Sequence, residues 1–392
     1  MQNIRQSPTD PAFVADPYPF YDRARALGEV VWWEDYDMPV ALSHAAVSAA
    51  LKSRDMGREP PDGPPVAPDH LRNFYAIEHN SMLELEAPRH TRLRGLVLRA
   101  FTSRRINGLA PEIEALCHDL IDAFPEGPFD LLPAYADRVP VIVIARLLGV
   151  PDSAAADLLR WSHAMVGMYQ ARRTHADEVA ADTAARDFAA FLRDHIARRR
   201  TTPGDDLLSH LIAAEDDGAR LSTDEMIATA VLLLNAGHEA TVHGIGNGVA
   251  ALYRHADPVA TTREASVAAT VEEILRFDPP LHLFVRHAYA PVQLGGETIP
   301  KGGRIGCLLA AANRDPAVFA NPDRFDPTRP ATGQMAFGAG PHFCVGAPLA
   351  RLEMQVALRV LYTRCPELRP VDPPRIADIY HFRGLEALVV DR

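Results

Sequence analysis

The spacing of apolar and polar residues predicts a chain that is mainly α-helical. Apolar residues recur at intervals of three and four through most of the region between residues 85 and 275, which is the period of one helix face. This pattern predicts helices over residues 93–101, 109–122, 137–148, 154–169 and 178–199. The bulk of the molecule is therefore expected to be helical.

The longest predicted helix begins at Ser222. Ser222 and Glu225 have the spacing of a capping box, and the apolar pattern then continues without a proline to about Arg254. About thirty helical residues make a rod of roughly 45 Å. Ala, Leu and Val surround much of this segment, so we expect a buried central helix.

Strand patterns are fewer and shorter. They predict strands over Val30–Trp33, Val40–Leu42, Phe284–Ala290, Gln293–Leu294, Arg304–Leu309 and Leu388–Val390. The stretch Glu59–His70 carries five prolines and predicts a loop, which is either a passive connector or the lid of a binding site. We expect small marginal β-sheets on a helical body. No change in composition marks a second domain, so we expect one domain over residues 1–392.

Charge and composition exclude several classes of protein. The formal net charge of −11 is unsuited to a protein that binds nucleic acid by neutralising phosphates. No apolar run approaches the roughly 20 residues of a membrane span, and the first residues lack a signal-peptide pattern. We therefore expect a soluble, cytoplasmic protein that binds neither nucleic acid nor membranes.

The cysteines do not form a recognisable disulfide or zinc pattern. Cys117, Cys307, Cys344 and Cys365 are widely spaced and include no CxxC pair. A lone cysteine is most often a small buried apolar residue. The residues around Cys344 are the exception, because FGAGPHFCVG at 337–346 places a glycine-rich turn before it. Glycines let backbone N–H groups approach the sulfur and moderate the charge of a metal-bound thiolate.

This segment, with the APLARLE that follows it, resembles the haem-binding loop and following helix of the cytochrome P450 family. The residues on the family pattern are Phe337, Gly338, Gly340, His342, Cys344, Gly346, Ala350 and Arg351. Further matches occur in order along the chain, from DPYPFYDRAR at 16–25 to RGLEAL at 383–388. The resemblance implies the cytochrome P450 fold, with a long central helix and small sheets.

The resemblance also implies haem b as cofactor, with Cys344 as the axial thiolate ligand of the iron. Four residues match positions that bind the haem propionates: His90, Arg94, Arg286 and His342. Phe337 and Gly338 match haem contacts of the cysteine loop. Ala236 and Gly237 match small residues that let the central helix pass close over the haem and leave room for dioxygen.

Two further family motifs concern structure and catalysis. Glu273 and Arg276 match the family's ExxR pair, and PDRF places Arg324 as the third member of a buried, structural ion triad. The segment NAGHEATVH at 235–243 resembles the oxygen-binding segment, and Glu239 matches the acid that relays protons.

The oxygen-binding segment departs from the family at one position. Ala240 stands where the family usually has threonine, and Thr241 follows one residue later. One residue rotates a helix by about 100°, so Thr241 cannot take the place of the missing hydroxyl. The catalytic candidates are therefore Glu239, Ala240 and Thr241. Proton delivery through a substrate hydroxyl with ordered water, and delivery through water alone, both remain open.

The same segment superficially resembles the zinc-binding HExxH motif. His238 and His243 are five residues apart instead of four, which puts them about 140° apart around a helix. We therefore expect packed or hydrogen-bonded histidines at these positions and no HExxH zinc site.

The chain contains no GxGxxG or P-loop that would carry its own nicotinamide or flavin domain. The resemblance then implies electrons from a separate ferredoxin and ferredoxin reductase. Six arginines lie between Arg89 and Arg105, which is either a solvated helix face or a docking surface for an acidic donor. The implied reaction inserts one oxygen atom from dioxygen into a C–H bond of a small or medium apolar organic substrate.

Substrate contacts are implied in four segments: Gly57–Met82, Leu232–Ala236, Leu281–Val285 and Tyr380–Phe382. The apolar residues expected in the pocket are Phe74, Tyr75, Leu283, Phe284 and Phe382, with His282 or Arg58 to orient a polar end. Two other functions stay open. One is a peroxygenase driven by hydrogen peroxide, and the other is a haem-binding protein without catalysis.

Overall fold

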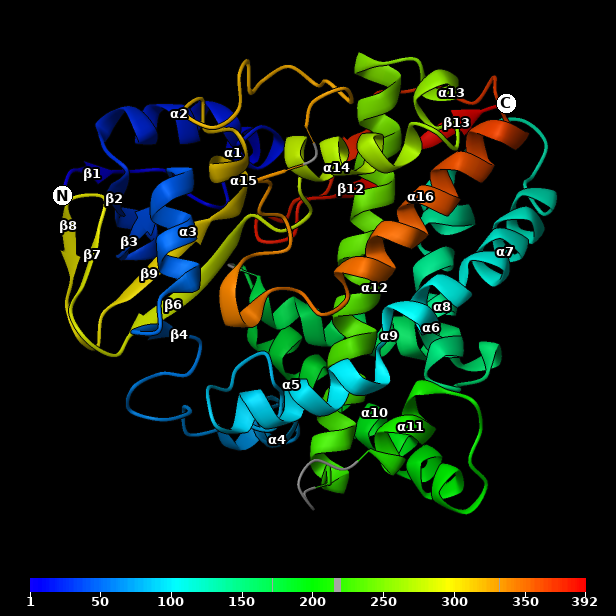
Figure 1. Cartoon of the computed structure of the whole chain (residues 1–392), viewed down its shortest axis with the longest axis horizontal. Helices are drawn as coiled ribbons and strands as arrows, with labels where there is room; N and C mark the ends of the chain where they lie inside the picture. The colour runs from blue at the N-terminus through cyan, green and yellow to red at the C-terminus, as the bar shows by residue number, and fades with distance from the viewer. Residues whose placement is uncertain (171, 215–219, 331) are drawn as a thin grey trace. The chain divides into compact units, whose positions relative to one another are not determined.

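The computed structural model describes residues 1–170, 172–214, 220–330 and 332–392 (Figure 1). The chain forms two compact units. The first unit comprises Met1–Pro61, Ala110–Asp137 and Ala240–Arg392, and the second comprises Asp62–Leu109 and Arg138–Glu239. One domain over residues 1–392 stays a prediction.

The β-structure of the described residues lies in the first unit. The largest sheet has six strands in the order β1-β2-β3-β9-β6-β4. Their bounds are β1 Asn3–Ile4, β2 Val30–Trp33, β3 Met38–Ala41, β9 Arg304–Leu308, β6 Leu283–Ala288 and β4 Met56–Gly57. β3 and β9 pair in parallel, whereas β6 and β9 are antiparallel. Figure 1 shows the blue N-terminal strands beside the yellow strands β6 and β9, so two distant parts of the chain build one sheet.

Three smaller sheets complete the β-structure of the described residues. They are β10 Arg369–Pro370 with β13 Val389–Asp391 and β5 Phe129–Asp130, β11 Arg375–Ile376 with β12 Leu385–Ala387, and β7 Val292–Leu294 with β8 Glu297–Ile299. The longer helices of this unit are α2 Tyr18–Leu27, α3 His44–Lys52, α7 Ala110–Asp122, α14 Val267–Phe277 and α16 Ala347–Arg364, and the short ones are α1 Pro11–Ala15, α13 Pro258–Thr261 and α15 Leu309–Asn313. Aromatic rings fill the core beneath the large sheet, where the ring centroids of Phe20 and Trp33 lie 4.7 Å apart.

The second unit is helical in its described residues. Its helices are α4 Arg72–Glu78, α5 Arg89–Ala100, α6 Ser103–Gly108, α8 Arg138–Leu147, α9 Ala155–Val166, α10 His175–Thr201 and α11 Leu207–Ala213. The capping box of α10 and the aspartate cap of α11 define where these helices begin. Apolar residues on one face of α9 are buried, as their three- and four-residue spacing predicts, whereas α8 is buried at every position from Val139 to Ala145.

Helix α12, Thr223–His255, is the longest at 33 residues. The predicted capping box is present, because Glu225 N donates to Ser222 Oγ at 3.1 Å and Ser222 N donates to Glu225 Oε2 at 2.9 Å. Thr223–Glu239 belong to the second unit and Ala240–His255 to the first. Many of its apolar residues are buried on several sides, so the prediction of a long buried helix is confirmed.

The predicted long elements are confirmed to within a few residues, and Glu59–Pro68 carries neither helix nor strand. The pattern did not indicate two-residue strands such as β1 and β4, or helices α2 and α3. No helix in the described part of the chain combines the length and apolarity needed to cross a bilayer.

Candidate functional site

The loop before Cys344 is held in a tight backbone conformation. Gly338 and Gly340 have φ values of +69° and +72°, a region that side chains disfavour. A Cβ atom on Gly340 would also collide with the carbonyl oxygen of Leu51. Inside the loop, Cys344 N donates to Phe337 O at 3.0 Å. The two glycines therefore fix the backbone that presents Cys344.

Cys344 is exposed, whereas the other three cysteines, all within the described residues, are buried. Burial raises the pKa of Cys117 to about 12 and that of Cys307 to about 11, so these groups remain neutral thiols. Cys344 lies just before the N-terminus of α16, where the helix dipole favours a negative charge. The structure thus offers one accessible sulfur in a setting that favours the thiolate.

An ion pair between α16 and α14 contacts the loop that precedes Cys344. Arg351 of α16 forms a bidentate pair with Glu272 of α14, with Nε–Oε1 at 2.5 Å and Nη2–Oε2 at 3.1 Å. The Arg351 guanidinium also lies 4.5 Å from the centroid of the Phe337 ring. Phe337 is therefore held in place by a cation that is itself held by α14.

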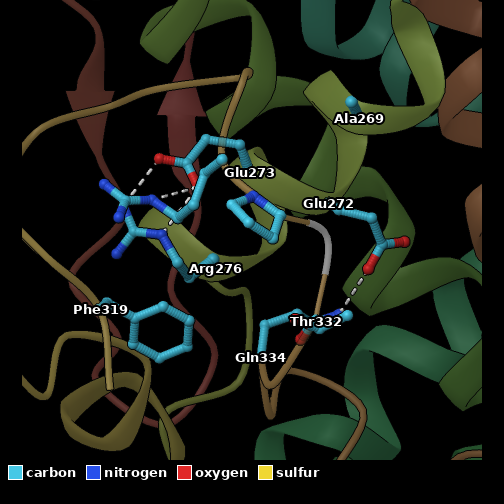
Figure 2. Close-up of a pocket in the computed structure, with 9 residues that line it drawn as sticks. Ala269, Glu272, Glu273, Arg276, Phe319, Thr332 and Gln334 are labelled. Carbon is cyan, nitrogen blue, oxygen red and sulfur yellow. Dashed lines mark hydrogen bonds and ion pairs between the residues drawn. The ribbon is translucent and has the colours of Figure 1, made fainter. Parts of the chain in front are cut away.

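Glu273 and Arg276 form a buried pair on α14, and Figure 2 shows the two side chains turned toward each other. Arg276 Nε donates to Glu273 Oε2 at 2.7 Å, and Nη2 donates to Oε1 at 2.8 Å. Arg276 also donates to the carbonyl oxygens of Asn313, Pro322 and Arg324. The pair therefore fastens α14 to the C-terminal end of α15 and to the turn that contains Pro322 and Arg324.

The third cation of this group is Arg329, and the prediction of Arg324 is wrong. Arg329 Nε lies 3.5 Å from Glu273 Oε2, and its side chain is 12% exposed. Arg324 is exposed and contributes only its backbone carbonyl oxygen to Arg276. The turn at Asn321–Arg324 directs the backbone of Arg324 inward, so the later arginine is the one that reaches the carboxylate.

The face of α12 that carries Leu232, Ala236 and Ala240 is incompletely covered. Ala236 is exposed and Ala240 is half-buried, whereas Thr241 is only 3% exposed. Thr241 thus lies on a different face from Ala240, as the helical rotation predicts. A Cβ atom on Gly237 would lie 3.2 Å from Ile144 Cγ1, so this glycine lets α8 approach α12.

Comparison with known proteins identifies the family. Residues 144–365 match the family model described as Cytochrome P450. The chain is 38% identical over 391 residues to the cytochrome P450 monooxygenase PikC of Streptomyces venezuelae, covering 96% of this chain and 91% of that protein. The chain belongs to the cytochrome P450 family. It is therefore an oxidoreductase of the monooxygenase class.

Other relatives and structures agree with this family. The vitamin D(3) 25-hydroxylase of Pseudonocardia autotrophica is 41% identical over 367 residues, covering 91% of this chain and 88% of that protein. The crystal structure of P450BioI in complex with an acyl carrier protein carrying hexadec-9Z-enoic acid superposes with a TM-score of 0.91 at 31% identity, covering 97% of this chain and 99% of that one. The predicted cytochrome P450 fold is confirmed.

Cytochrome P450 proteins bind haem b through an axial cysteine thiolate. The residues present fit this cofactor, because Cys344 is exposed at the end of a loop whose tight backbone is set by the positive φ values of Gly338 and Gly340. A Cβ atom on Gly346 would lie 3.8 Å from Cys344 Sγ, so the sulfur has backbone on this side as well.

Of the four predicted propionate ligands, two lie in the first unit of the P450 and two in the second. Arg286 on β6 is 3% exposed, donates to Val285 O at 3.0 Å and lies 5.8 Å from the Phe284 ring centroid. His342 is half-buried in the 3₁₀ turn Gly340–His342 of the cysteine loop. His90 and Arg94 are one turn apart on α5, with His90 buried and Arg94 half-buried.

Two of the four predicted substrate segments lie side by side in the first unit. Leu281 and Phe382 form an isolated β-bridge, and His282 N donates to His381 O at 3.4 Å. Arg58 lies 5.3 Å from the Phe284 ring centroid and donates to Val285 O. Phe284, Phe382 and Arg58 therefore remain candidates for substrate contact.

Three residues in these segments belong to the core instead. Leu283 and Tyr380 are buried in the aromatic cluster beneath the large sheet. His282 is fully buried, its Nδ1 is 2.8 Å from Tyr21 Oη, and burial lowers its pKa to about 3. The predictions of Leu283 as a pocket residue and of His282 as a substrate contact are wrong, because Leu283 packs within the aromatic cluster and His282 is held by Tyr21.

Proposed function

We propose that the chain acts as one domain over residues 1–392 and inserts one oxygen atom from dioxygen into a C–H bond of a small or medium apolar organic substrate. We further propose that a ferredoxin and a ferredoxin reductase supply the electrons. The observation that carries this proposal is the exposed Cys344 sulfur in its glycine loop before α16. The apolar, half-open face of α12 at Ala236 and Ala240 supports it.

In this proposal each residue of the site has a separate task. Cys344 ligates the iron, and Phe337 and Gly338 shape the loop around the sulfur. Four cations or neutral imidazoles bind the propionates: His90, Arg94, Arg286 and His342. The haem, when bound, supplies the chemistry that activates dioxygen and transfers one of its atoms. Ala236 and Gly237 keep α12 free of bulky side chains at this point.

Protons are proposed to reach the site from Glu239. Its side chain is 10% exposed, so the carboxyl is mostly buried but keeps some contact with solvent, from which it can take up protons. Ala240 offers no hydroxyl, and Thr241 is buried on another face, so neither side chain continues the path. A hydroxyl of the substrate with ordered water, or water alone, would then complete it.

Ala240→Thr tests the proton path. If a substrate hydroxyl takes part, the added threonine is redundant, and the fraction of electrons recovered in product should change less than about twofold. The measurement is product formed per NADPH consumed with a surrogate ferredoxin and reductase. A several-fold rise in this ratio would contradict participation of the substrate hydroxyl. Val242→Thr, at a half-buried position of the same helix, is the matched control for an added hydroxyl.

The Arg89–Arg105 cluster of arginines is proposed as the docking surface for the ferredoxin. Arg92 pairs with Glu225, and Arg105 pairs with Asp205 at 3.4 Å. Arg99 and Arg104 are exposed. Those two therefore carry much of the accessible positive charge that an acidic donor would meet.

Charge reversal tests this surface. Arg99→Glu with Arg104→Glu should slow ferredoxin-supported turnover several-fold at low salt, and the difference from the unmodified protein should shrink as ionic strength rises. Arg186→Glu on α10, also exposed, is the matched control and should have little effect. The measurement is the turnover rate against ferredoxin concentration at several salt concentrations. An equal loss in Arg186→Glu would contradict a specific docking surface.

The relatives differ in the molecules that their names give: one is a vitamin D(3) 25-hydroxylase, and another is in complex with an acyl carrier protein that carries hexadec-9Z-enoic acid. Both molecules are largely apolar, which supports an apolar substrate here without selecting one. Compounds that shift the haem spin state should be tested for turnover under ¹⁸O₂. Incorporation of one ¹⁸O atom with the ferredoxin system supports the proposal. Product formed only with hydrogen peroxide would favour a peroxygenase, and no product under either condition would favour a haem-binding protein without catalysis.

A further inference from the structure

Two histidines and one glutamate meet in the second unit, between α9 and α12. His163 Nε2 and His238 Nε2 each lie 3.3 Å from the same oxygen, Glu239 Oε1. The three ligand atoms all lie within 4.8 Å of one another. His238 is 1% exposed and Glu239 is 10% exposed, whereas the side chain of His163 is 55% exposed. The group is therefore buried on the α12 side and open to solvent through His163.

The hydrogen bond made by Nδ1 of His238 determines whether its other ring nitrogen, Nε2, carries a proton in the neutral ring. Nδ1 lies 2.7 Å from the carbonyl oxygen of Leu234, which can only accept, so Nδ1 carries the proton. In the neutral form of this ring, Nε2 carries a lone pair and lies 3.3 Å from Glu239 Oε1. Nε2 is buried and has no hydrogen-bond donor among the described residues. A positive ion placed between Nε2 and Glu239 Oε1 would bind to both and would satisfy the buried nitrogen.

The separations match those between ligands of a tetrahedral metal ion. Ligand atoms at 2.0–2.1 Å from such an ion are about 3.3–3.4 Å apart, as both nitrogens are from Glu239 Oε1. The remaining nitrogen–nitrogen separation is no more than 4.8 Å. The Nδ1–H bond of His238 to a backbone carbonyl is also the support that metal-binding histidines use.

We propose that His163, His238 and Glu239 bind one divalent transition-metal ion, with zinc as the best match for two imidazoles and one carboxylate. Water takes the fourth position, on the open side by His163. Of the two histidines of the HEATVH segment, only His238 belongs to this cluster, so the site is not an HExxH site.

A second cluster on the same unit is less suited to a metal. His70 Nε2 is 2.8 Å from Glu178 Oε2, a direct hydrogen bond. Arg173 Nε also donates to Glu178, at 3.1 Å, so this carboxylate already has a permanent cation beside it. His175 is 73% exposed. This cluster therefore supplies a matched control on the same unit.

Metal binding would compete with the proposed role of Glu239. A carboxylate that ligates zinc is unavailable to move protons, so occupancy should slow product formation. This consequence rests on the proposed function, whereas the metal site itself does not. The site would thus make turnover sensitive to free zinc.

The test uses the full-length haem protein, freed of adventitious metal by dialysis against a chelator, with Zn²⁺ alone as the probe. Calorimetry and equilibrium dialysis measure stoichiometry and affinity, and X-ray absorption at the zinc edge reports the ligands. We expect one zinc ion with nitrogen and oxygen ligands at about 2.0–2.1 Å. His163→Ala should weaken its affinity at least about tenfold, and His175→Ala should leave it unchanged.

The proposal is overturned if the protein retains no zinc, or if His175→Ala and not His163→Ala removes it. Turnover with and without Zn²⁺ is then compared within each variant, relative to that variant's own zinc-free rate. Inhibition that disappears in His163→Ala supports both the site and the role of Glu239. Zinc bound at the predicted ligands without inhibition supports the site and contradicts the role of Glu239 in proton transfer.

Discussion

Cys344→Ser should abolish the strongly red-shifted carbon monoxide difference band of a thiolate haem and reduce product formation to background. A serine hydroxyl remains protonated at neutral pH and is a harder, weaker ligand for iron than a thiolate. The chain should still fold, because Cys344 is exposed and its backbone hydrogen bond to Phe337 does not involve the side chain. The loss is therefore one of ligation and not of structure.

The matched control is Cys365→Ala at the other end of α16. Cys365 is 5% exposed and follows the last helical residue, so its loss removes a buried sulfur beside the same helix. The control should keep the thiolate band at nearly unchanged wavelength. Spectra of reduced protein with and without carbon monoxide, together with far-ultraviolet circular dichroism, make the comparison. A thiolate band that persists in Cys344→Ser would contradict the assignment of the ligand.

The helical body was predictable because its signal repeats. Helices such as α10 and α12 contain many turns, so the apolar period and a capping box both mark them. Two-residue strands such as β1 and β4 carry no period, and they exist only because a partner strand lies beside them. The partner strands, β2 for β1 and β6 for β4, come from other parts of the chain, and the residues of a two-residue strand do not reveal that pairing.

Some residues of the site could be predicted from neighbouring residues in the sequence, whereas others are brought together only by folding. The cysteine loop is contiguous, and the positive φ values of Gly338 and Gly340 explain why glycine occurs there. The choice between Arg324 and Arg329 depends on which way a turn directs its side chains, and no spacing rule supplies that direction. His163 lies far from Glu239 in sequence, so only the packing of α9 against α12 brings the two together.

The other large effect is expected at Arg276. Arg276→Leu removes both hydrogen bonds to Glu273 and leaves a carboxylate that is 3% exposed with a weaker set of partners. Breaking a buried ion pair from one side costs about 3–5 kcal/mol. This is a large fraction of the stability of a typical folded protein. We expect little folded, haem-containing protein at about 37 °C and a clearly lower urea midpoint in whatever is recovered.

Substitutions of two nearby arginines, Arg324 and Arg329, provide the controls for this prediction. Arg324→Leu removes a side chain that is exposed and keeps the carbonyl oxygen that Arg276 uses, so its urea midpoint should stay close to that of the unmodified protein. Arg329→Leu removes the 3.5 Å contact with Glu273 and should fall between the two. This order follows from which groups face the buried carboxylate and not from charge alone. If Arg324→Leu destabilised the protein as much as Arg276→Leu, the geometry of the triad described above would be wrong.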